Sequence, residues 1–397
     1  MKILHVIPSM NPKYGGPAQG IRNYEYGLKG KNVQRHIVCF DDPESVKGWL
    51  AGDLKVVSLG SVNNRWQNNS KLKSWLYENA TKYNAIVING IWLYHSYATI
   101  NIINKLKSKG KIVPKVFVMP HGMLDPWFQT AKIRGLKRLR NSIYWHLIEK
   151  KVIYDADGLL FTCQEELELA KTTFNDYHPK SVKNIGYGIA PPPAYTEAMK
   201  TAFNVLYANS ASKPYLLFMS RVHPKKGLDL LLDAYEKILK NKNVYNTTLT
   251  NLVVAGPGLD TDYGKEMLQK VNRSPALKER VHFTDMISGD TKWGAIYGCE
   301  AFILPSHQEN FGIAVAEALA CAKPVLISNQ VNIWKEVESV NAGIINPDTV
   351  EGTIKSLETF FSLSESERNK MKEQALIAYQ QFFDVQVTAD NFIQAIS

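Results

Sequence analysis

The sequence has few cysteines and no long apolar run. Its 397 residues include four cysteines, Cys39, Cys163, Cys299 and Cys321, which are far apart and lie in or beside apolar segments. This spacing is typical of reduced core residues in a cytosolic protein, and it argues against a disulfide framework or a cysteine metal site. No apolar run reaches the roughly 18 residues that a membrane-spanning helix needs. The opening residues, MKILHVIPSM, are typical of a strand and not of a signal peptide.

The glycine pattern of a dinucleotide-binding fold is also missing. Gly15 and Gly16 stand between a predicted strand and a predicted helix, but no third glycine follows at the required offset. This argues against an NAD enzyme. The pair can still offer backbone amides to a phosphate, although tight turns also use glycine for steric reasons alone.

Acidic residues are too few to balance the basic ones, so the formal net charge is +10. Nucleic acid, an anionic membrane and a diphosphate substrate are the partners that such a charge favours. The main basic segment is 127–151, where seven Lys and Arg residues alternate with aromatic and aliphatic ones and Glu149 is the single acid. We expect an amphipathic helix or helix pair that contacts anionic headgroups, or alternatively a solvated face over an ordinary core helix. No nucleic-acid motif accompanies the charge, so nucleic acid is disfavoured.

The length and the alternation of short apolar strands with helical patterns predict two α/β domains, each a doubly wound, Rossmann-like parallel sheet. Three consecutive prolines, 191–193, interrupt the alternation, and we expect the linker at about 190–213. The predicted domains are 1–195, 196–375 and a C-terminal helix, 376–397.

One stretch, AFILPSHQENFGIAVAEALACAKPVLIS at 301–328, combines two predicted strands, a polar elbow and a small-residue helix. Glu309 lies in the elbow, and Glu317 lies about one and a half turns into the helix. The helix start favours an anion, while the two acids can bond hydroxyl groups, as a nucleotide sugar requires. The alternative is a solvated elbow acid and a helix acid paired with a neighbouring cation.

A basic motif, SRVHPKKG at 220–227, directly follows a predicted strand. Arg221 and Lys226 therefore leave the carboxyl end of that strand, where open α/β sheets bind ligands. Two cations at this edge can neutralise a diphosphate. The alternative is a pair of ordinary surface cations.

Together these motifs resemble the retaining glycosyltransferases of the GT-B fold, family 4, also called glycosyl transferases group 1. The resemblance rests on Glu309 and Glu317 in PSHQENFGIAVAEALACAKPV and on SRVHPKKG, and it extends to VVAGPG, VHFTDM, the Gly15-Gly16 loop and PHGMLDPW. It covers nearly the whole chain. One departure is Cys321-Ala322-Lys323, where the family often has glycine, and we expect it to affect only the turn.

The resemblance implies roles for particular residues. Arg221 and Lys226 would hold the diphosphate, Glu317 the ribose and Glu309 the transferred sugar. His121 would lie beside that sugar as a fourth catalytic residue, although a hydrogen-bonded loop histidine is an equally simple interpretation. The remaining donor-binding residues would be Gly15, Gly16, Gly256, Asp285, Met286, Ile287, Asn310, Phe311, Gly312 and Ile313. The two domains would face each other across a cleft, with the C-terminal helix crossing back to the first domain.

The expected activity is retaining, metal-independent transfer of a hexose from a nucleotide sugar, with UDP-glucose favoured, in polysaccharide or lipopolysaccharide biosynthesis. From their position in the predicted first domain alone, we expect a lipid-linked acceptor to contact Trp92, Tyr94, Trp127 and Arg134. The alternatives are a GDP-mannose donor, a soluble sugar-phosphate acceptor or a noncatalytic nucleotide-sugar binder. No cofactor is expected, although Asp260-Thr261-Asp262 has the spacing of a divalent-cation motif. We expect a cytoplasmic protein that can bind peripherally to the cytoplasmic face of the inner membrane.

Overall fold

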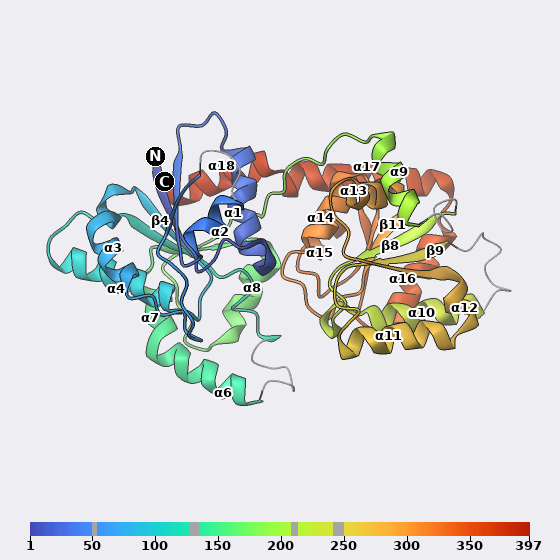
Figure 1. The fold of residues 1–397 in the computed structure, drawn as a ribbon, viewed down its shortest axis with the longest axis horizontal. Coiled ribbons are helices and arrows are strands. Elements are labelled where there is room, and N and C mark those ends of the chain that lie inside the picture. The colour runs from blue at the N-terminus through green and yellow to red at the C-terminus, as the bar shows by residue number, and fades with distance from the viewer. Residues whose placement is uncertain (50–53, 128–134, 208–212, 241–249) are drawn as a thin grey trace. The chain divides into compact units, whose positions relative to one another are not determined.

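The chain folds into two compact units (Figure 1). The computed structural model describes residues 1–49, 54–127, 135–207, 213–240 and 250–397. The first unit consists of Met1–Ala190 with Val385–Ser397, and the second of Pro191–Asp384.

The first unit is built on a seven-stranded, wholly parallel sheet in the order β3-β2-β1-β4-β5-β6-β7. Its central strands are continuous apolar runs, as in β4, where all five residues are buried, because helices cover both faces. The strands are β1 (Lys2–Val6), β2 (Gln34–Cys39), β3 (Lys55–Ser58), β4 (Ala85–Asn89), β5 (Lys115–Met119), β6 (Gly158–Phe161) and β7 (Val182–Asn184).

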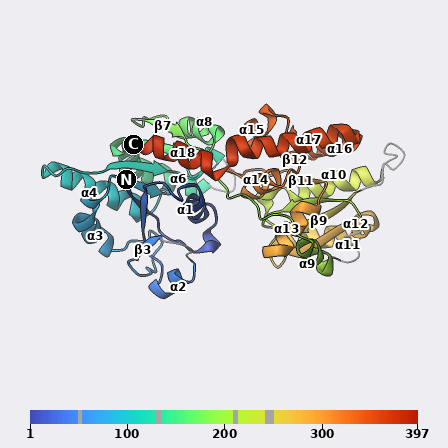
Figure 2. The same ribbon diagram turned by 90° about the horizontal axis from the view of Figure 1, so that it is seen from above.

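The last helix of the chain belongs to the first unit. Helix α18 (Val385–Ile396) packs on α1 (Gly16–Gly27) (Figure 2). The ring of Phe392 stacks on Tyr24 with centroids 4.9 Å apart. The expected return of the C-terminal helix to the first domain is therefore confirmed, but the returning part begins at Val385 and not at residue 376 as predicted. The other helices of this unit are α2 (Pro43–Lys47), α3 (Lys71–Asn79), α4 (Tyr94–Ser108), α6 (Gly135–Tyr144), α7 (Lys150–Asp155) and α8 (Gln164–Thr173).

The second unit has a six-stranded parallel sheet in the order β10-β9-β8-β11-β12-β13. The strands are β8 (Tyr215–Met219), β9 (Asn251–Ala255), β10 (Val281–Asp285), β11 (Ala301–Leu304), β12 (Val325–Ser328) and β13 (Gly343–Asn346). The helices are α9 (Glu197–Leu206), α10 (Leu228–Lys240), α11 (Asp262–Arg273), α12 (Pro275–Arg280), α13 (Gly289–Gly298), α14 (Ile313–Ala320), α15 (Trp334–Ser339), α16 (Val350–Ser362) and α17 (Glu365–Ala378). The predicted α/β class with two doubly wound sheets is confirmed.

Helix α9 lies within the segment predicted as a linker, so that prediction was wrong for 197–206. Thr196 caps the helix by accepting from the amide of Met199, and the buried ring of Phe203 packs on Tyr215 of β8 with centroids 5.3 Å apart. Helix α9 also contacts α13 closely, because Gly294 offers no side chain against the backbone of Met199. The prolines at 191–193 suggested an extended linker, but the amphipathic pattern that follows them is what forms structure.

No helix in the described ranges is both long enough and apolar enough to cross a bilayer.

Candidate functional site

Both sheets reverse their strand order once, and the motifs that contain Arg221, Lys226 and Glu309 lie at one of these points. In the second unit the reversal lies between β8 and β11, which pair side by side. SRVHPKKG follows β8, and the elbow of Glu309 follows β11. The loops after adjacent strands at such a reversal form the crevice where α/β sheets bind ligands.

Lys226 and Glu309 form an ion pair at this edge, from Nζ to Oε2. The side chain of Lys226 is 9% exposed and that of Glu309 is 23% exposed, so the pair is largely shielded from water. Gly227 follows Lys226 in the left-handed region, with φ of 67°, and a Cβ there would lie 2.0 Å from the carbonyl oxygen of Pro305. Glycine is therefore needed to bring the two loops this close.

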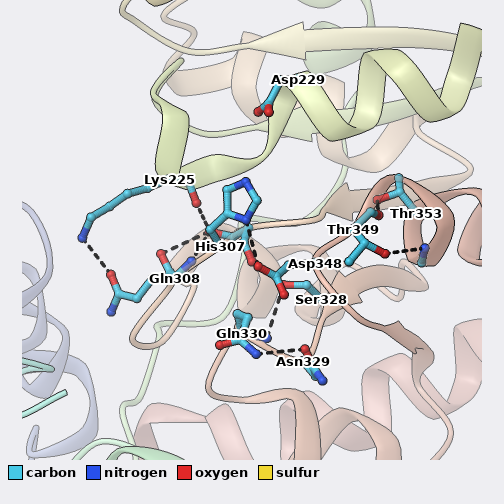
Figure 3. A network of polar contacts seen from close by, with 12 residues as sticks. Lys225, Asp229, His307, Gln308, Ser328, Asn329, Gln330, Asp348, Thr349 and Thr353 are labelled. Atoms are coloured by element: carbon cyan, nitrogen blue, oxygen red, sulfur yellow. Dashed lines mark hydrogen bonds and ion pairs between the residues drawn. The ribbon is translucent and has the colours of Figure 1, made fainter. Parts of the chain in front are cut away.

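A polar network holds the elbow against the basic motif (Figure 3). The backbone oxygen of Lys225 accepts from the amide of His307 and from Oγ of Ser306, both at 2.8 Å. Nζ of Lys225 donates to Oε1 of Gln308 at 3.0 Å, and Nδ1 of His307 lies 2.8 Å from Oδ2 of Asp348. This network holds the backbone on either side of the Lys226–Glu309 pair.

Glu309 is also fixed through its own backbone, and Glu317 through a second ion pair. The amide of Glu309 donates to the carbonyl of Gln330 at 3.0 Å. Gly312, with φ of 81°, turns the chain into α14, which carries Glu317. Oε1 of Glu317 lies 2.6 Å from Nζ of Lys292, and both side chains are mostly buried, at 16% and 24% exposed. Each predicted acid therefore has a cation from another loop or helix.

Arg221 and two of the three predicted donor-binding residues at 285–287 are exposed to solvent. Arg221 is exposed and makes no ion pair with any described residue. Asp285 has φ of 55°, an unusual backbone conformation for a residue other than glycine, and its side chain accepts from the amide of Met286 at 2.9 Å. Met286 is exposed and Ile287 half-buried, while the amide of Gly256 donates to the carbonyl of Asp285 at 2.7 Å.

The remaining predicted donor residues of this unit have differing surroundings. Phe311 is buried and packs edge-on against Phe383, with ring centroids 5.6 Å apart, so its side chain supports the loop. Asn310 and Ile313 are half-buried beside it.

In the first unit the predicted residues lie after β1 and β5. Gly15, with φ of 73°, and Gly16 begin α1, and a Cβ at either would meet no atom within 4 Å. His121 has φ of 52°, and its Nε2 lies 3.3 Å from Oδ1 of Asn89. Burial lowers the pKa of His121 to about 4, so the imidazole is neutral at neutral pH and can exchange hydrogen bonds without adding charge.

Two of the nominated acceptor residues, Trp92 and Tyr94, contact the same aromatic group, because Trp92 packs on Tyr144 and the rings of Tyr144 and Tyr94 both pack on Trp66. Trp92 is half-buried and its Nε1 donates to the carbonyl of Met123 at 3.1 Å, while Tyr94 is buried edge-on against Trp66. Trp127 is half-buried, and Arg134 lies outside the described residues. Beside them, a cavity of about 240 Å³ opens at the carboxyl ends of β1 and β4, lined mainly by apolar side chains including Ile7, Ile91, Leu93 and Met123, with the buried His95.

The Asp260-Thr261-Asp262 sequence begins α11. Oγ1 of Thr261 caps the helix by accepting from the amide of Gly264 at 3.1 Å, and Asp262 lies in the first turn, where the helix dipole favours an acid. Among the described residues, no group of His, Cys, Asp and Glu is arranged to hold a metal ion. All four cysteines are buried.

Sequence reasoning missed Lys292 and the His307–Asp348 pair. Lys292 lies in α13 outside any motif, and only its position one helix away from α14 brings it to Glu317. Asp348 is 41 residues from His307 in sequence, so no local pattern connects them.

Comparison with known proteins places the second unit in a family. Residues 206–376 match the family model described as glycosyl transferases group 1. This segment is a glycosyl transferases group 1 domain. It contains SRVHPKKG, the elbow and both glutamates, so the resemblance stated from these motifs is confirmed for the domain that carries them.

Relatives and solved structures extend the likeness. This chain is 32% identical, over 111 residues, to D-inositol 3-phosphate glycosyltransferase of Frankia alni. The matched residues cover 28% of this chain and 27% of the relative. The chain spans less than half the length of the curated relatives it matches, between 27% and 46%.

The crystal structure of Anabaena Alr3699/HepE in complex with UDP and glucose has a TM-score of 0.73 at 17% identity, covering 100% of this chain and 99% of that one. The apo lipopolysaccharide outer core galactosyltransferase WaaB has a TM-score of 0.66 at 16% identity, covering 100% and 99%. These likenesses establish the GT-B fold for the whole chain.

Proposed function

We propose that this chain is a retaining glycosyltransferase that moves a hexose from a nucleoside-diphosphate sugar to a glycan acceptor. The observation that carries the proposal is the edge between β8 and β11, where Arg221 is free of ion pairs among the described residues and Lys226 is held beside Glu309. An open guanidinium and a shielded ammonium at one strand edge suit a diphosphate. The acids beside them suit the hydroxyls of a sugar and a ribose.

The proposed reaction breaks the bond between the anomeric carbon and the diphosphate oxygen, and the electron pair leaves with the diphosphate. Arg221 and Lys226 stabilise that charge in place of a metal ion. The acceptor hydroxyl oxygen forms the new bond on the same face of the sugar, and its proton passes to the departing phosphate. Glu309 holds the sugar by hydrogen bonds, and no protein nucleophile is required.

UDP-glucose is the first donor to test, because the HepE structure contains UDP and glucose. A GDP-mannose donor is the alternative. We further propose a lipid-linked glycan acceptor in polysaccharide or lipopolysaccharide synthesis at the cytoplasmic face of a membrane, with segment 127–151 contacting the lipid. The likeness to WaaB supports this choice.

A soluble sugar-phosphate acceptor is the second candidate. The name of the Frankia alni relative, D-inositol 3-phosphate glycosyltransferase, supports it. A noncatalytic nucleotide-sugar binder on the same fold is the third. Release of UDP from UDP-glucose, followed with lipid extracts or with sugar phosphates as acceptors, separates the three.

Calorimetric titration with UDP, GDP and ADP, in EDTA and in magnesium, tests the donor site. We expect one nucleotide to bind in EDTA, and Arg221→Ala to weaken it by about 10-fold to 100-fold, as for the loss of a charged hydrogen bond. Arg273→Ala is the matched control, because Arg273 is an exposed arginine of the same unit in the last turn of α11. Binding that requires magnesium and ignores Arg221 would refute the metal-free diphosphate site.

A further inference from the structure

The helical segment 135–155 in the first unit has an apolar row on its exposed side. Leu139 is 62% exposed, Ile143 53% and Leu147 75%. They are spaced four residues apart through α6 and the π-helical segment Trp145–Glu149, so they share one face. Single exposed aliphatic residues are ordinary, but three aligned on one helix mark an interaction surface. In Figure 1, α6 runs along the outer edge of the first unit.

The opposite side of this segment is already anchored in the unit. Trp145 is fully buried and stacks on Phe174, with centroids 4.1 Å apart and planes 4° apart. Nε1 of Trp145 donates to Asp176 at 2.7 Å. Because these contacts complete the packing of the segment, the outward row is not needed to fold the unit.

A second anchor is Glu149, which is fully buried within the π-helical turn. Its Oε1 accepts from the amide of Trp92 at 2.9 Å and from Oγ of Ser96 at 2.8 Å. This burial removes the one carboxylate of residues 135–151 from the surface, whereas the same stretch contains five Lys and Arg residues. Arg140 and Lys151 are exposed and make no ion pair with a described residue.

We infer that Leu139, Ile143 and Leu147 insert into an anionic lipid bilayer. An aliphatic row flanked by cations is the surface that lies in the interface of such a bilayer, where each aliphatic side chain leaves water and each cation meets an anionic headgroup. The inference extends the membrane contact of the proposed function from a basic segment to three named side chains. Its test does not depend on glycosyl transfer.

A fluorescent label reports insertion directly. Leu147→Cys carries an environment-sensitive nitrobenzoxadiazole group, and the four native cysteines are buried, which favours selective labelling. Ile112→Cys is the matched control, because Ile112 is 94% exposed in the same unit but lies outside segment 135–155. With phosphatidylcholine–phosphatidylglycerol vesicles we expect a blue shift from position 147 and none from 112. Unchanged emission at 147, with vesicles bound, overturns the inference.

Flotation with the same vesicles measures the contribution of the row. We expect Leu139→Ser/Ile143→Ser/Leu147→Ser to weaken partitioning on the order of 100-fold, and Ile112→Ser to leave it unchanged. Pure phosphatidylcholine vesicles should bind the native protein less than the anionic ones. Equal binding by the triple variant and the native protein overturns the inference, as does absence of binding by the native protein.

Two further measurements separate the alternatives. If sedimentation shows that the native chain self-associates through this row and does not float with vesicles, the partner is a second copy and the inference is wrong. Calorimetry with UDP on the triple variant should match the native protein, which also establishes that the variant is folded. If none of UDP, GDP and ADP binds any of these proteins, the proposed function fails, while the vesicle results still decide the bilayer contact.

Discussion

The sheet of each unit reverses its strand order once, but the side chains at the two reversals are charged in the second unit and neutral in the first. In the second unit, between β8 and β11, the acids Glu309 and Glu317 each have a lysine partner. In the first unit, between β1 and β4, the buried groups are neutral, because burial lowers the pKa of His95 to about 4 and that of His5 well below its ordinary value. One fold thus provides a charged edge suited to a diphosphate and a neutral edge suited to an uncharged polyol.

The largest expected effect comes from breaking a charge pair in the second unit. Lys226→Met leaves Glu309 largely buried without its cation, which we expect to cost about 3–5 kcal/mol of unfolding free energy. Donor turnover should fall by at least about 100-fold. Urea denaturation and release of UDP from UDP-glucose measure the two effects.

The double variant Lys226→Met/Glu309→Gln serves as the control, because it removes both charges. It should recover most of the lost stability and none of the activity. If the double variant is as unstable as the single one, the ion pair is not the cause.

Glu149 tests the neutral character of the first unit. Burial raises the pKa of Glu149 to about 7, against an ordinary 4.5. Between pH 4.5 and pH 7 the carboxyl group is therefore protonated in the folded state and ionised in the unfolded state. The contribution of Glu149 to the free energy of unfolding is therefore fully present at pH 4.5 and below, and about 3 kcal/mol of it is lost as the pH rises to 7.

We expect Glu149→Gln, which can still accept from Trp92 and Ser96, to be more stable than the native protein at pH 8 and about equal at pH 4.5. Urea denaturation of both proteins at the two values measures this difference. The comparison cancels His5, His95 and His121, whose lowered pKa values make stability rise with pH over part of the same window. A difference that does not change with pH would show that Glu149 is ionised in the folded state.

Lys292→Met has a smaller expected effect. It removes the partner of Glu317, whose side chain is 16% exposed, and should destabilise the second unit by about 1–3 kcal/mol. We expect weaker binding of UDP and unchanged binding of a diphosphate that lacks ribose. Calorimetry with UDP and with pyrophosphate makes the comparison, and equal weakening of both ligands would contradict it.

The smallest expected effect is that of Asp260→Asn/Asp262→Asn. If the charged edge works through Arg221 and Lys226, turnover of UDP-glucose in EDTA and in magnesium should stay within about twofold of the native protein, and stability should fall by less than about 1 kcal/mol through the dipole of α11. Loss of magnesium-dependent turnover in this variant would show that a metal ion held by Asp260 and Asp262, and not Arg221 and Lys226, stabilises the diphosphate.

Local sequence patterns predicted the fold class well, because buried parallel strands are continuous apolar runs and the motifs follow them directly. They also predicted that Arg221 and Lys226 follow one strand directly, and that the elbow of Glu309 follows another. That these two strands pair at the reversal of the sheet is known only from the structure. They could not predict which cation meets which acid, since the Lys292–Glu317 contact depends on how α13 packs beside α14.

Segment 127–151 illustrates the same limit. Its composition predicted a basic amphipathic surface, yet its one acid is buried by contacts with Trp92 and Ser96, more than 50 residues earlier in the chain. Which aliphatic residues remain outside depends on those distant contacts. Likewise, α9 was mistaken for linker because prolines are a stronger local signal than a short amphipathic pattern.

The first unit cannot complete its folding until helix α18 has been synthesised. Its residues Val385, Ala389 and Phe392 are fully buried in the first unit, so that unit stays unfinished on the ribosome until the 194 residues 191–384 have been added. At ordinary rates of translation this delay is on the order of ten seconds or more. During this delay, Tyr24 and Leu28 lack the apolar contacts that Val385, Ala389 and Phe392 later provide.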